Sequence, residues 1–129
     1  FMDFCAASQR EKSNAEALVE AALSISNALL EQNCRHFIVW YDAEAKKLSK
    51  QRISKIDDIY ALMSYLMSAS CYEGFVDLKE MYKEAFPYGL YAADITLKLS
   101  GEILTNEETA GYFNAVNIKK SMSECLIRI

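Results

Sequence analysis

Apolar residues between positions 13 and 32 recur every three or four residues, which is the period of an α-helix. Ser13 and Glu16 have the spacing of a capping box, in which both side chains accept backbone amides at the start of a helix. The pattern predicts a helix that begins at Ser13, ends near Gln32 and packs one face against a sheet. The inward positions are Leu18, Ala22, Ile25 and Leu29.

The same period predicts two further helices in the middle of the chain. One begins at Ser54, with Asp57 in its first turn, and ends near Ser70. A shorter one follows Asp77, a residue type that accepts hydrogen bonds at a helix start, and ends before Pro87. The residues at helical spacing in the first of these are Ile56, Ile59, Tyr60, Met63, Leu66 and Met67.

Runs of β-branched and aromatic residues predict the strands. Residues 1–4 read as the end of a buried strand, and residues 35–41 form a continuous apolar run typical of a strand buried on both faces. Residues 47–53 are polar and basic, which suits the edge of a sheet. Residues 93–99 alternate between apolar and polar positions and predict a strand with one partly exposed face.

Strands and helices therefore alternate along the chain. Thr105 and Glu108 predict one more helix, and residues 124–129 a last strand. Such alternation is typical of a mostly parallel, doubly wound sheet with helices on both faces, so we expect a three-layer α/β fold with one antiparallel edge strand. The 129 residues fit a single domain. Because they open inside a strand-like segment, we expect them to be part of a longer protein.

Composition narrows the class of protein. A hydrophobic fraction of 52% predicts a packed core, and a net charge of -4 argues against nucleic-acid binding. The four cysteines have the spacing of neither a zinc site nor a disulfide framework, so we expect buried, reduced thiols in a reducing compartment. No stretch approaches the ~18 uncharged apolar residues of a membrane span.

Three segments carry a resemblance to a known family. They are residues 1–8 (Phe-Met-Asp-Phe-Cys-Ala-Ala-Ser) before a long helix, residues 37–42 (Phe-Ile-Val-Trp-Tyr-Asp), and residues 74–78 (Gly-Phe-Val-Asp-Leu) before another helix. The chain resembles the von Willebrand factor A-type domain, and more narrowly the bacterial family catalogued as domain of unknown function 58. The resemblance implies a Rossmann-like sheet, a cytoplasmic domain of a membrane-anchored bacterial parent, and a MoxR-type AAA ATPase as partner.

Metal-binding members of the von Willebrand A class carry Asp-x-Ser-x-Ser after the first strand, a Thr before the third helix and an Asp after the fourth strand. In this chain the matching positions are Asp3, Cys5, Ala7, Val76 and Gly101. Only Asp3 keeps a hard oxygen ligand, because Cys is a soft ligand and the other three side chains offer none. The resemblance therefore implies a degenerate adhesion site without metal or cofactor. We expect Asp3 to accept amides of its own loop.

Two functions from different classes remain open. The leading prediction is a non-catalytic protein–protein interaction module, with Ser8, Phe75, Asp77 and Ser100 as loop residues available to a partner. The alternative is a small-molecule or phosphate-binding domain of flavodoxin-like architecture, or an enzyme, that uses the loops after the first and fourth strands. Backbone amides that converge in these loops would favour the small-molecule or phosphate-binding domain, and an apolar surface would favour the interaction module. Loop aromatics that would suit a protein interface are Tyr72, Phe75, Phe86, Tyr88 and Tyr91.

Other candidate sites have simpler explanations. Cys5 and Arg10 resemble a phosphatase loop, but the loop is one residue short and has no glycine, so an inert thiol is expected. His36 is the only histidine, which excludes a multi-histidine metal site and favours a structural role. A basic cluster suits a solvated edge strand, or contact with phosphates or an acidic partner. Its members are Lys46, Lys47, Lys50, Arg52 and Lys55.

Overall fold

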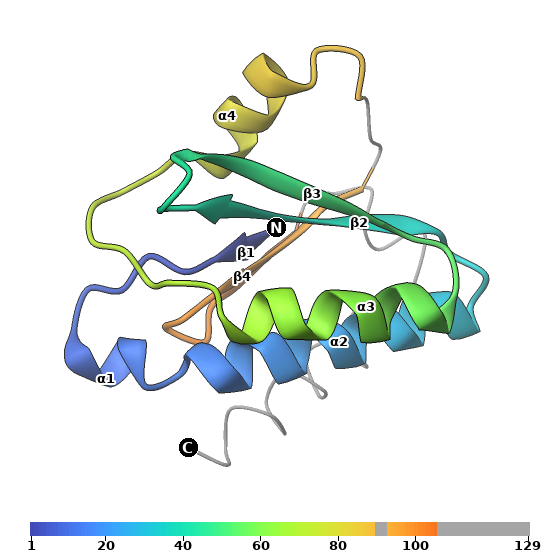
Figure 1. The fold of residues 1–129 in the computed structure, drawn as a ribbon, viewed down its shortest axis with the longest axis horizontal. Helices are drawn as coiled ribbons and strands as arrows, with labels where there is room; N and C mark the ends of the chain where they lie inside the picture. Colours follow the sequence, from blue (N-terminus) through green and yellow to red (C-terminus); the bar gives the residue numbers. More distant parts are fainter. Residues whose placement is uncertain (90–92, 106–129) are drawn as a thin grey trace.

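The opening segment of the chain forms the centre of a five-stranded sheet (Figure 1). The structure, a computed structural model, describes residues 1–89 and 93–105. β1 (Met2–Asp3) lies between β2 (His36–Asp42) and β4 (Ile95–Lys98) and is parallel to both. The chain is therefore a mixed α/β protein with a parallel centre, and the strand that the sequence places first is in the middle of the sheet, as predicted.

Both edges of the sheet are antiparallel, whereas the sequence predicted one. β3 (Lys47–Ile53) pairs with β2, and β5 (Ile103–Thr105) pairs with β4. The second hairpin forms because Gly101, at φ +92°, adopts the left-handed conformation that lets the chain reverse directly after β4. Thr105, predicted to open a helix, is the last residue of β5. That predicted helix and the strand at residues 124–129 lie outside the described residues.

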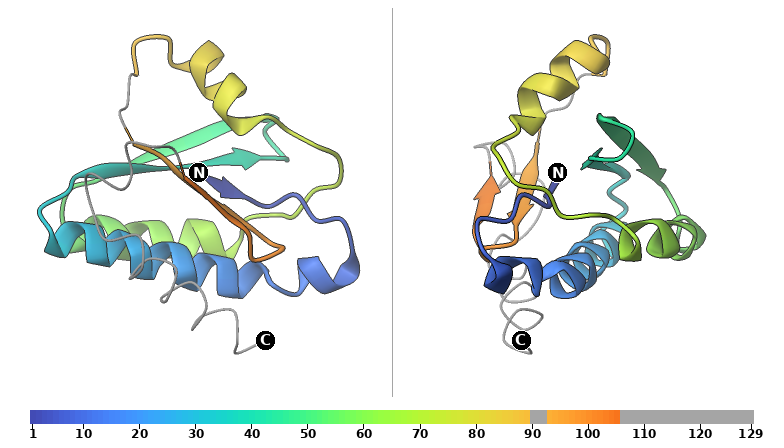
Figure 2. Two further views of the ribbon diagram at one scale, coloured as in Figure 1. Left: turned by 180° about the vertical axis from the view of Figure 1, so that it is seen from behind. Right: turned by 60° about the vertical axis from the view of Figure 1, so that its left-hand side comes forward.

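Two helices pack on one face of the sheet (Figure 2). α2 (Ala15–Glu31) and α3 (Ile56–Met67) run side by side and cover the side chains that alternate residues of the strands direct to this face. All four inward positions predicted for α2 are buried. The main residues of this core are Met2, Phe4, Leu18, Ile25, Ile38, Ile53, Leu62, Leu66, Leu97 and Leu99.

The opposite face carries the short helix α4 (Leu78–Ala85), which packs over β2 and β3. Its capping residue is Asp77, as predicted, and the Asp77 carboxylate accepts the backbone amide of Glu80 at 3.1 Å. Phe37, near the amino end of β2, is 50% exposed. The prediction of a strand buried on both faces is therefore wrong for that end, because α4 covers only part of the sheet. The second core consists of Val39, Leu48, Leu78 and Tyr82.

The helix predicted to begin at Ser13 is divided in two. A single turn, α1 (Gln9–Lys12), begins after Ser8, whose hydroxyl accepts the amide of Glu11 at 3.3 Å. The Ser13 hydroxyl donates to a carbonyl of that turn, and α2 follows Asn14. The predicted capping box at Ser13 is therefore wrong, because its hydroxyl ends α1 instead of starting α2.

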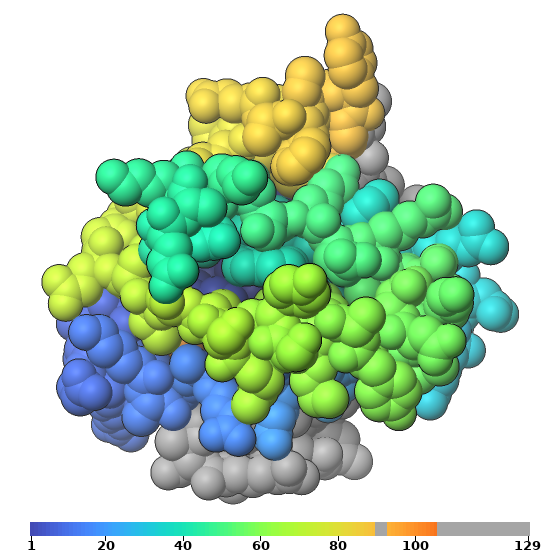
Figure 3. Space-filling model, in the orientation of Figure 1, coloured from blue at the N-terminus to red at the C-terminus, as the bar shows by residue number. Residues whose placement is uncertain are grey.

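α3 begins and packs differently from its prediction. Its start is capped by Asp58, which follows Asp57 in the first turn: the Asp58 carboxylate accepts the amides of Ser54 at 2.9 Å and Lys55 at 3.1 Å. It ends at Met67 and packs against α2 and β3 through Ile59, Leu62 and Leu66. Its outer side lies at the front surface of the molecule in Figure 3. No helix in the part of the chain that the structure describes is long and apolar enough to cross a membrane. Four of the six residues noted at helical spacing are exposed, namely Ile56, Tyr60, Met63 and Met67.

Candidate functional site

The carboxyl end of β1 is covered by a loop that is far away in the sequence. We call residues 3–8 and 71–77 together the mouth. Tyr72 forms a parallel bridge with Cys5, so this loop continues the sheet beyond β1. The amide of Ala6 donates to the Tyr72 carbonyl at 2.9 Å, and the Tyr72 amide donates to the Phe4 carbonyl at 3.2 Å. Backbone pairing therefore holds the two halves of the mouth together.

Asp3, the one potential hard ligand at the predicted degenerate site, is buried and bonded within the protein. Its carboxylate accepts the amide of Cys5 at 3.0 Å and the hydroxyl of Tyr72 at 3.2 Å. Burial, and secondly the nearby Asp3 carboxylate, raise the pKa of the Tyr72 hydroxyl, so it remains a proton donor. The Asp3 carboxylate thus accepts an amide of its own loop, which is the role expected for it.

The amides of residues 5–7, in the loop after β1, donate to acceptors inside the protein. Cys5 donates to Asp3, Ala6 to the Tyr72 carbonyl, and Ala7 to the Glu11 carboxylate at 3.4 Å. Phosphate-binding loops direct such amides together at the ligand. The mouth lacks the converging amides that the small-molecule alternative requires, at least among residues 5–7.

The Cys5 thiol is held in its protonated form. Its sulfur donates to the Gly74 carbonyl at 3.2 Å. Burial, then the Asp3 and Glu11 carboxylates, raise the pKa of the Cys5 thiol, which disfavours the reactive thiolate. Cys5, Cys34 and Cys71 are free and partly exposed, so the prediction of buried thiols is wrong for these three. Cys125 lies outside the described residues.

The other positions of the predicted degenerate site lie in different surroundings. Ala7 is exposed, Val76 packs against the core beneath α4, and Gly101 forms the turn between β4 and β5. None of these side chains carries an oxygen atom. Within residues 1–89 and 93–105, no group of three His, Cys, Asp or Glu side chains is placed to hold a metal ion.

The loop residues suggested for a partner are all exposed, but the polar ones have local hydrogen bonds. Ser8 and Asp77 cap α1 and α4, and the Ser100 hydroxyl accepts the Glu102 amide at 3.4 Å. Phe75 is 82% exposed at the mouth. The proposed aromatic rim is not continuous: Tyr72 and Phe86 pack against other rings, Tyr88 is exposed, and Tyr91 lies outside the described residues.

One residue of the basic cluster has a structural partner. The ammonium group of Lys50 lies 4.2 Å from the ring centroid of Phe37, 4.9 Å from that of Tyr82 and 4.7 Å from that of Phe86. It also donates to the Tyr82 hydroxyl at 2.8 Å. Lys50 therefore ties α4 to the β2–β3 hairpin. The remaining four are exposed, namely Lys46, Lys47, Arg52 and Lys55.

His36 has a structural setting. Its Nδ1 donates to the Cys34 carbonyl at 3.0 Å, so its Nε2 accepts the hydroxyl of Ser26. Burial lowers the pKa of the imidazole, which favours the neutral ring. His36 thereby joins α2 to the start of β2.

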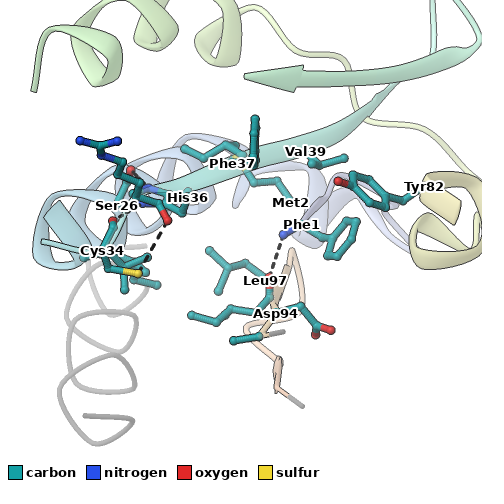
Figure 4. A pocket seen from close by; sticks show the side chains of 17 residues that line it. Phe1, Met2, Ser26, Cys34, His36, Phe37, Val39, Tyr82, Asp94 and Leu97 are labelled. Carbon is teal, nitrogen blue, oxygen red and sulfur yellow. Dashed lines mark hydrogen bonds between the residues drawn. The ribbon is translucent and has the colours of Figure 1, made fainter. Parts of the chain in front are cut away.

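A cavity of about 380 Å³ lies at the opposite end of β1 from the mouth (Figure 4). We call it the slot; it is bounded by residues 36–39 of β2, residues 93–95 at the start of β4, and the α2 side chains between Ala22 and Leu29, with Phe1 at one end. Sequence reasoning missed it because only the register of the strands reveals it. In comparisons with known proteins, the chain matches no protein-family model, no curated protein and no solved structure.

Proposed function

We propose that the chain is a non-catalytic protein-interaction module. The observation that carries the proposal is an exposed apolar row on α3, formed by Ile56, Tyr60, Met63 and Met67. These residues are spaced four, three and four apart, so they share one side of the helix, and the exposed fraction of Tyr60 is 64%. Contiguous apolar side chains with an aromatic member are typical of protein interfaces. We call these four residues the α3 row.

The arrangement of the mouth argues against the small-molecule alternative. A ligand site at the carboxyl ends of parallel strands needs groups that are directed at the ligand. In this chain Asp3 and the amides of residues 5–7 are bonded to the protein itself, and the pKa of the Cys5 thiol is raised. The polar groups at the mouth are therefore used to fix loops.

The family resemblance supplies the finer part of the proposal. A three-layer, doubly wound domain of the von Willebrand A type with a degenerate adhesion site is compatible with the central position of β1 and with helices on both faces. The resemblance to this family implies a membrane-anchored bacterial parent protein, with this domain in the cytoplasm. It also implies a MoxR-type AAA ATPase as the partner. The domain would then act in assembly rather than in catalysis.

Binding to a purified ATPase of the MoxR group tests the interaction. We expect the double variant Tyr60→Ser, Met63→Ser to raise the Kd at least about tenfold, the effect of roughly 1.4 kcal/mol. The matched control is Tyr65→Ser, which removes an equally exposed ring from another side of α3. Equal binding by the double variant and the unchanged chain would contradict a role for the α3 row, and no binding by the unchanged chain would contradict this partner.

A titration with Mg²⁺, Mn²⁺ and inorganic phosphate tests the mouth. We expect no saturable change in Tm, because Asp3 already has two donors and the loop amides have acceptors. A saturable rise in Tm with a cation that Asp3→Asn abolishes would mean that the adhesion site binds metal. A rise with phosphate would support the alternative function.

A further inference from the structure

In the sheet that the structure describes, β3 has a neighbouring strand on one side only (Figure 1). Each of its residues pairs in register with β2, from Lys47 opposite Asp42 to Ile53 opposite His36. The strand contains neither proline nor glycine, so its ladder is regular. Such an edge can accept a further strand, because its outward N–H and C=O groups follow one another at the spacing of a ladder.

The strand register shows which backbone groups point outward from β3. The backbone groups of Met2 point to β2, because the carbonyl of Phe1 points to β4, where it accepts an amide at 2.9 Å. Met2 lies opposite Trp40, and in a parallel pair the residue opposite a bonded one directs its own groups to the other side. Trp40 therefore bonds to Ser49 of β3. The residues of β3 whose groups point away from β2 are Leu48, Lys50 and Arg52.

One of these outward groups has a substitute partner from its own strand. The side-chain amide of Gln51 donates to the Arg52 carbonyl at 3.3 Å. The Arg52 carbonyl is thus at the open edge, as the register indicates. A side-chain amide on an exposed strand is a partner that the backbone amide of an added strand can replace.

The edge is positively charged. Residues 45–56 contain five basic side chains and no acidic one, although the whole chain has a net charge of -4. Like charges would repel a second copy of β3, whereas an acidic strand would be attracted. The ion pairs found in residues 1–89 and 93–105 involve other lysines. The exposed basic residues at this edge are Lys46, Lys47, Arg52 and Lys55.

Packing fixes the edge before any partner binds. Leu48 is buried under α4, and Ile53 is buried on the side of α2 and α3, so β3 is anchored on both faces. The ammonium group of Lys50 also holds the strand to Tyr82 of α4. A strand that is already ordered loses little conformational entropy when another strand pairs with it.

We propose that the β3 edge is a docking site for an extended, acidic segment of a partner protein, which adds a strand beside β3. The backbone of that segment bonds to the outward groups of β3. Its carboxylates lie beside Lys47 on the α3 side of the sheet and beside Arg52 on the α4 side. The site is separate from the α3 row, so the inference goes beyond the proposed function and does not depend on it.

Two synthetic peptides test the charge of the occupant. The probe is acetyl-Glu-Thr-Val-Glu-Val-Thr-Glu-amide, which matches β3 in length. The control peptide has lysine at the three acidic positions and keeps the same strand-forming residues. We expect saturable binding of the acidic peptide to the unchanged chain, and a Kd at least about tenfold higher for the basic peptide. Equal binding of both peptides, or no saturable binding of the acidic one, would overturn the proposal.

Hydrogen exchange locates the bound peptide. With the acidic peptide at about ten times its Kd, only the free fraction of the chain exchanges, so the outward amides should exchange about tenfold more slowly. These are the amides of Leu48, Lys50 and Arg52. The amides of Ser49 and Gln51 point to β2 and serve as internal controls. Binding without slower exchange at the outward amides would place the peptide elsewhere and overturn the proposal.

A matched pair of variants tests the backbone of the edge. Arg52→Pro removes one outward N–H and no bond to β2, a position at which edge strands tolerate proline. Arg52→Thr also removes the charge but keeps the N–H. We expect the Kd of the acidic peptide to be at least about tenfold higher for Arg52→Pro than for Arg52→Thr, and equal binding by the two would overturn strand addition. If Arg52→Pro does not fold, exchange at the outward amides of the unchanged chain decides.

Three further measurements identify other occupants. The double variant Tyr60→Ser, Met63→Ser should bind the acidic peptide as the unchanged chain does, and a loss of binding would place the peptide on the α3 row. A thymidine tetranucleotide, with the same net charge as the acidic peptide, should bind more weakly than the peptide, and equal or tighter binding would assign the edge to phosphates. Exchange at the outward amides should not depend on protein concentration, and slowing at high concentration would identify a second copy. Each contrary result would overturn the proposal.

Discussion

The two ends of β1 use their chemical groups in opposite ways. At the mouth, the Asp3 carboxylate and three successive amides are bonded within the protein. At the slot, largely apolar walls surround a cavity, and the amine of Phe1 is buried beside it. Open α/β sheets ordinarily bind ligands beyond the carboxyl ends of their strands. Here that end is closed by the protein itself, and the unfilled volume is at the amino end.

α2 extends from the mouth to the slot, so substitutions along this one helix can measure the difference in packing between the two ends of β1. At the mouth end of α2, the Asn14 side-chain amide donates to the Leu99 carbonyl at 2.7 Å. At the other end, Ile25 and Leu29 border the slot. Identical substitutions along α2 therefore compare a closely packed region with one that faces a cavity.

The largest expected effect is the difference between Leu18→Ala and Leu29→Ala. Leu18 is fully buried away from the slot, so its truncation should lower the free energy of unfolding by about 3–5 kcal/mol. Leu29 borders the slot and has fewer contacts to lose, so we expect about 2 kcal/mol or less. Urea unfolding measures both. Equal losses would mean that the slot is closed in solution, and the contrast would fail.

The second effect is a dependence of stability on pH that originates at the slot. The pKa of the Phe1 amine is about 6 in the folded chain and 8.0 in the unfolded one, so the unfolded state binds more protons between these values. Stability should therefore fall as pH decreases from 8 to 6, by about 2–3 kcal/mol, and should not change above 8 through this group.

Acetylation of the Phe1 amine is the control for this dependence. It removes the titrating group but keeps His36, whose lowered pKa also reduces stability as the pH falls below about 6.5. The difference between the free and acetylated chains therefore isolates the amine. Identical profiles of unfolding free energy against pH for the two chains would show that the amine is solvated, and would weaken the distinction between the slot and the mouth.

The third effect concerns the mouth. Asp3→Ala leaves the Cys5 amide and the Tyr72 hydroxyl without their acceptor, so we expect a loss of about 2 kcal/mol in unfolding free energy. Tyr72→Phe should cost about 1 kcal/mol, and the double variant should cost less than the sum. Additive losses in urea unfolding would mean that the Asp3–Tyr72 bond contributes nothing to closing the mouth.

The smallest effect tests the side of the slot next to α4. Lys50→Met removes an ammonium group held over three rings, and we expect a loss of about 1 kcal/mol. Lys47→Met, at an exposed position of the same strand, should be close to neutral. If the two changes have equal effects on Tm, the rings around Lys50 do not fix α4 near the slot.

The elements of the fold were largely predictable, because each rests on local patterns. The period of α2 and the β-branched run of β2 gave their positions within a few residues. The start of α2 was less predictable, because Ser13 and Asn14 bond to residues outside the predicted cap. The second antiparallel edge was missed because it depends on whether the chain reverses after Gly101, a choice that tertiary packing decides.

The site was only partly predictable. The role of Asp3 followed from an acidic residue at the end of a strand, where its carboxylate reaches an amide two residues on. Its second donor, Tyr72, is distant in the sequence and no local pattern connects them. The slot depends on the relative lengths of three strands, and the α3 row on how α3 is rotated against β3. Both are properties of the assembled sheet.

The place of β1 has a consequence for synthesis on the ribosome. β1 pairs with β4, which begins more than ninety residues after it, so one side of β1 stays unpaired until β4 has left the tunnel. At about 5–20 residues per second this delay lasts on the order of 5–20 s. During that time β1, α2 and the β2–β3 hairpin can form, but β1 still lacks β4 on its other side. The nascent chain is thus a natural substrate for chaperones until Leu97 is made.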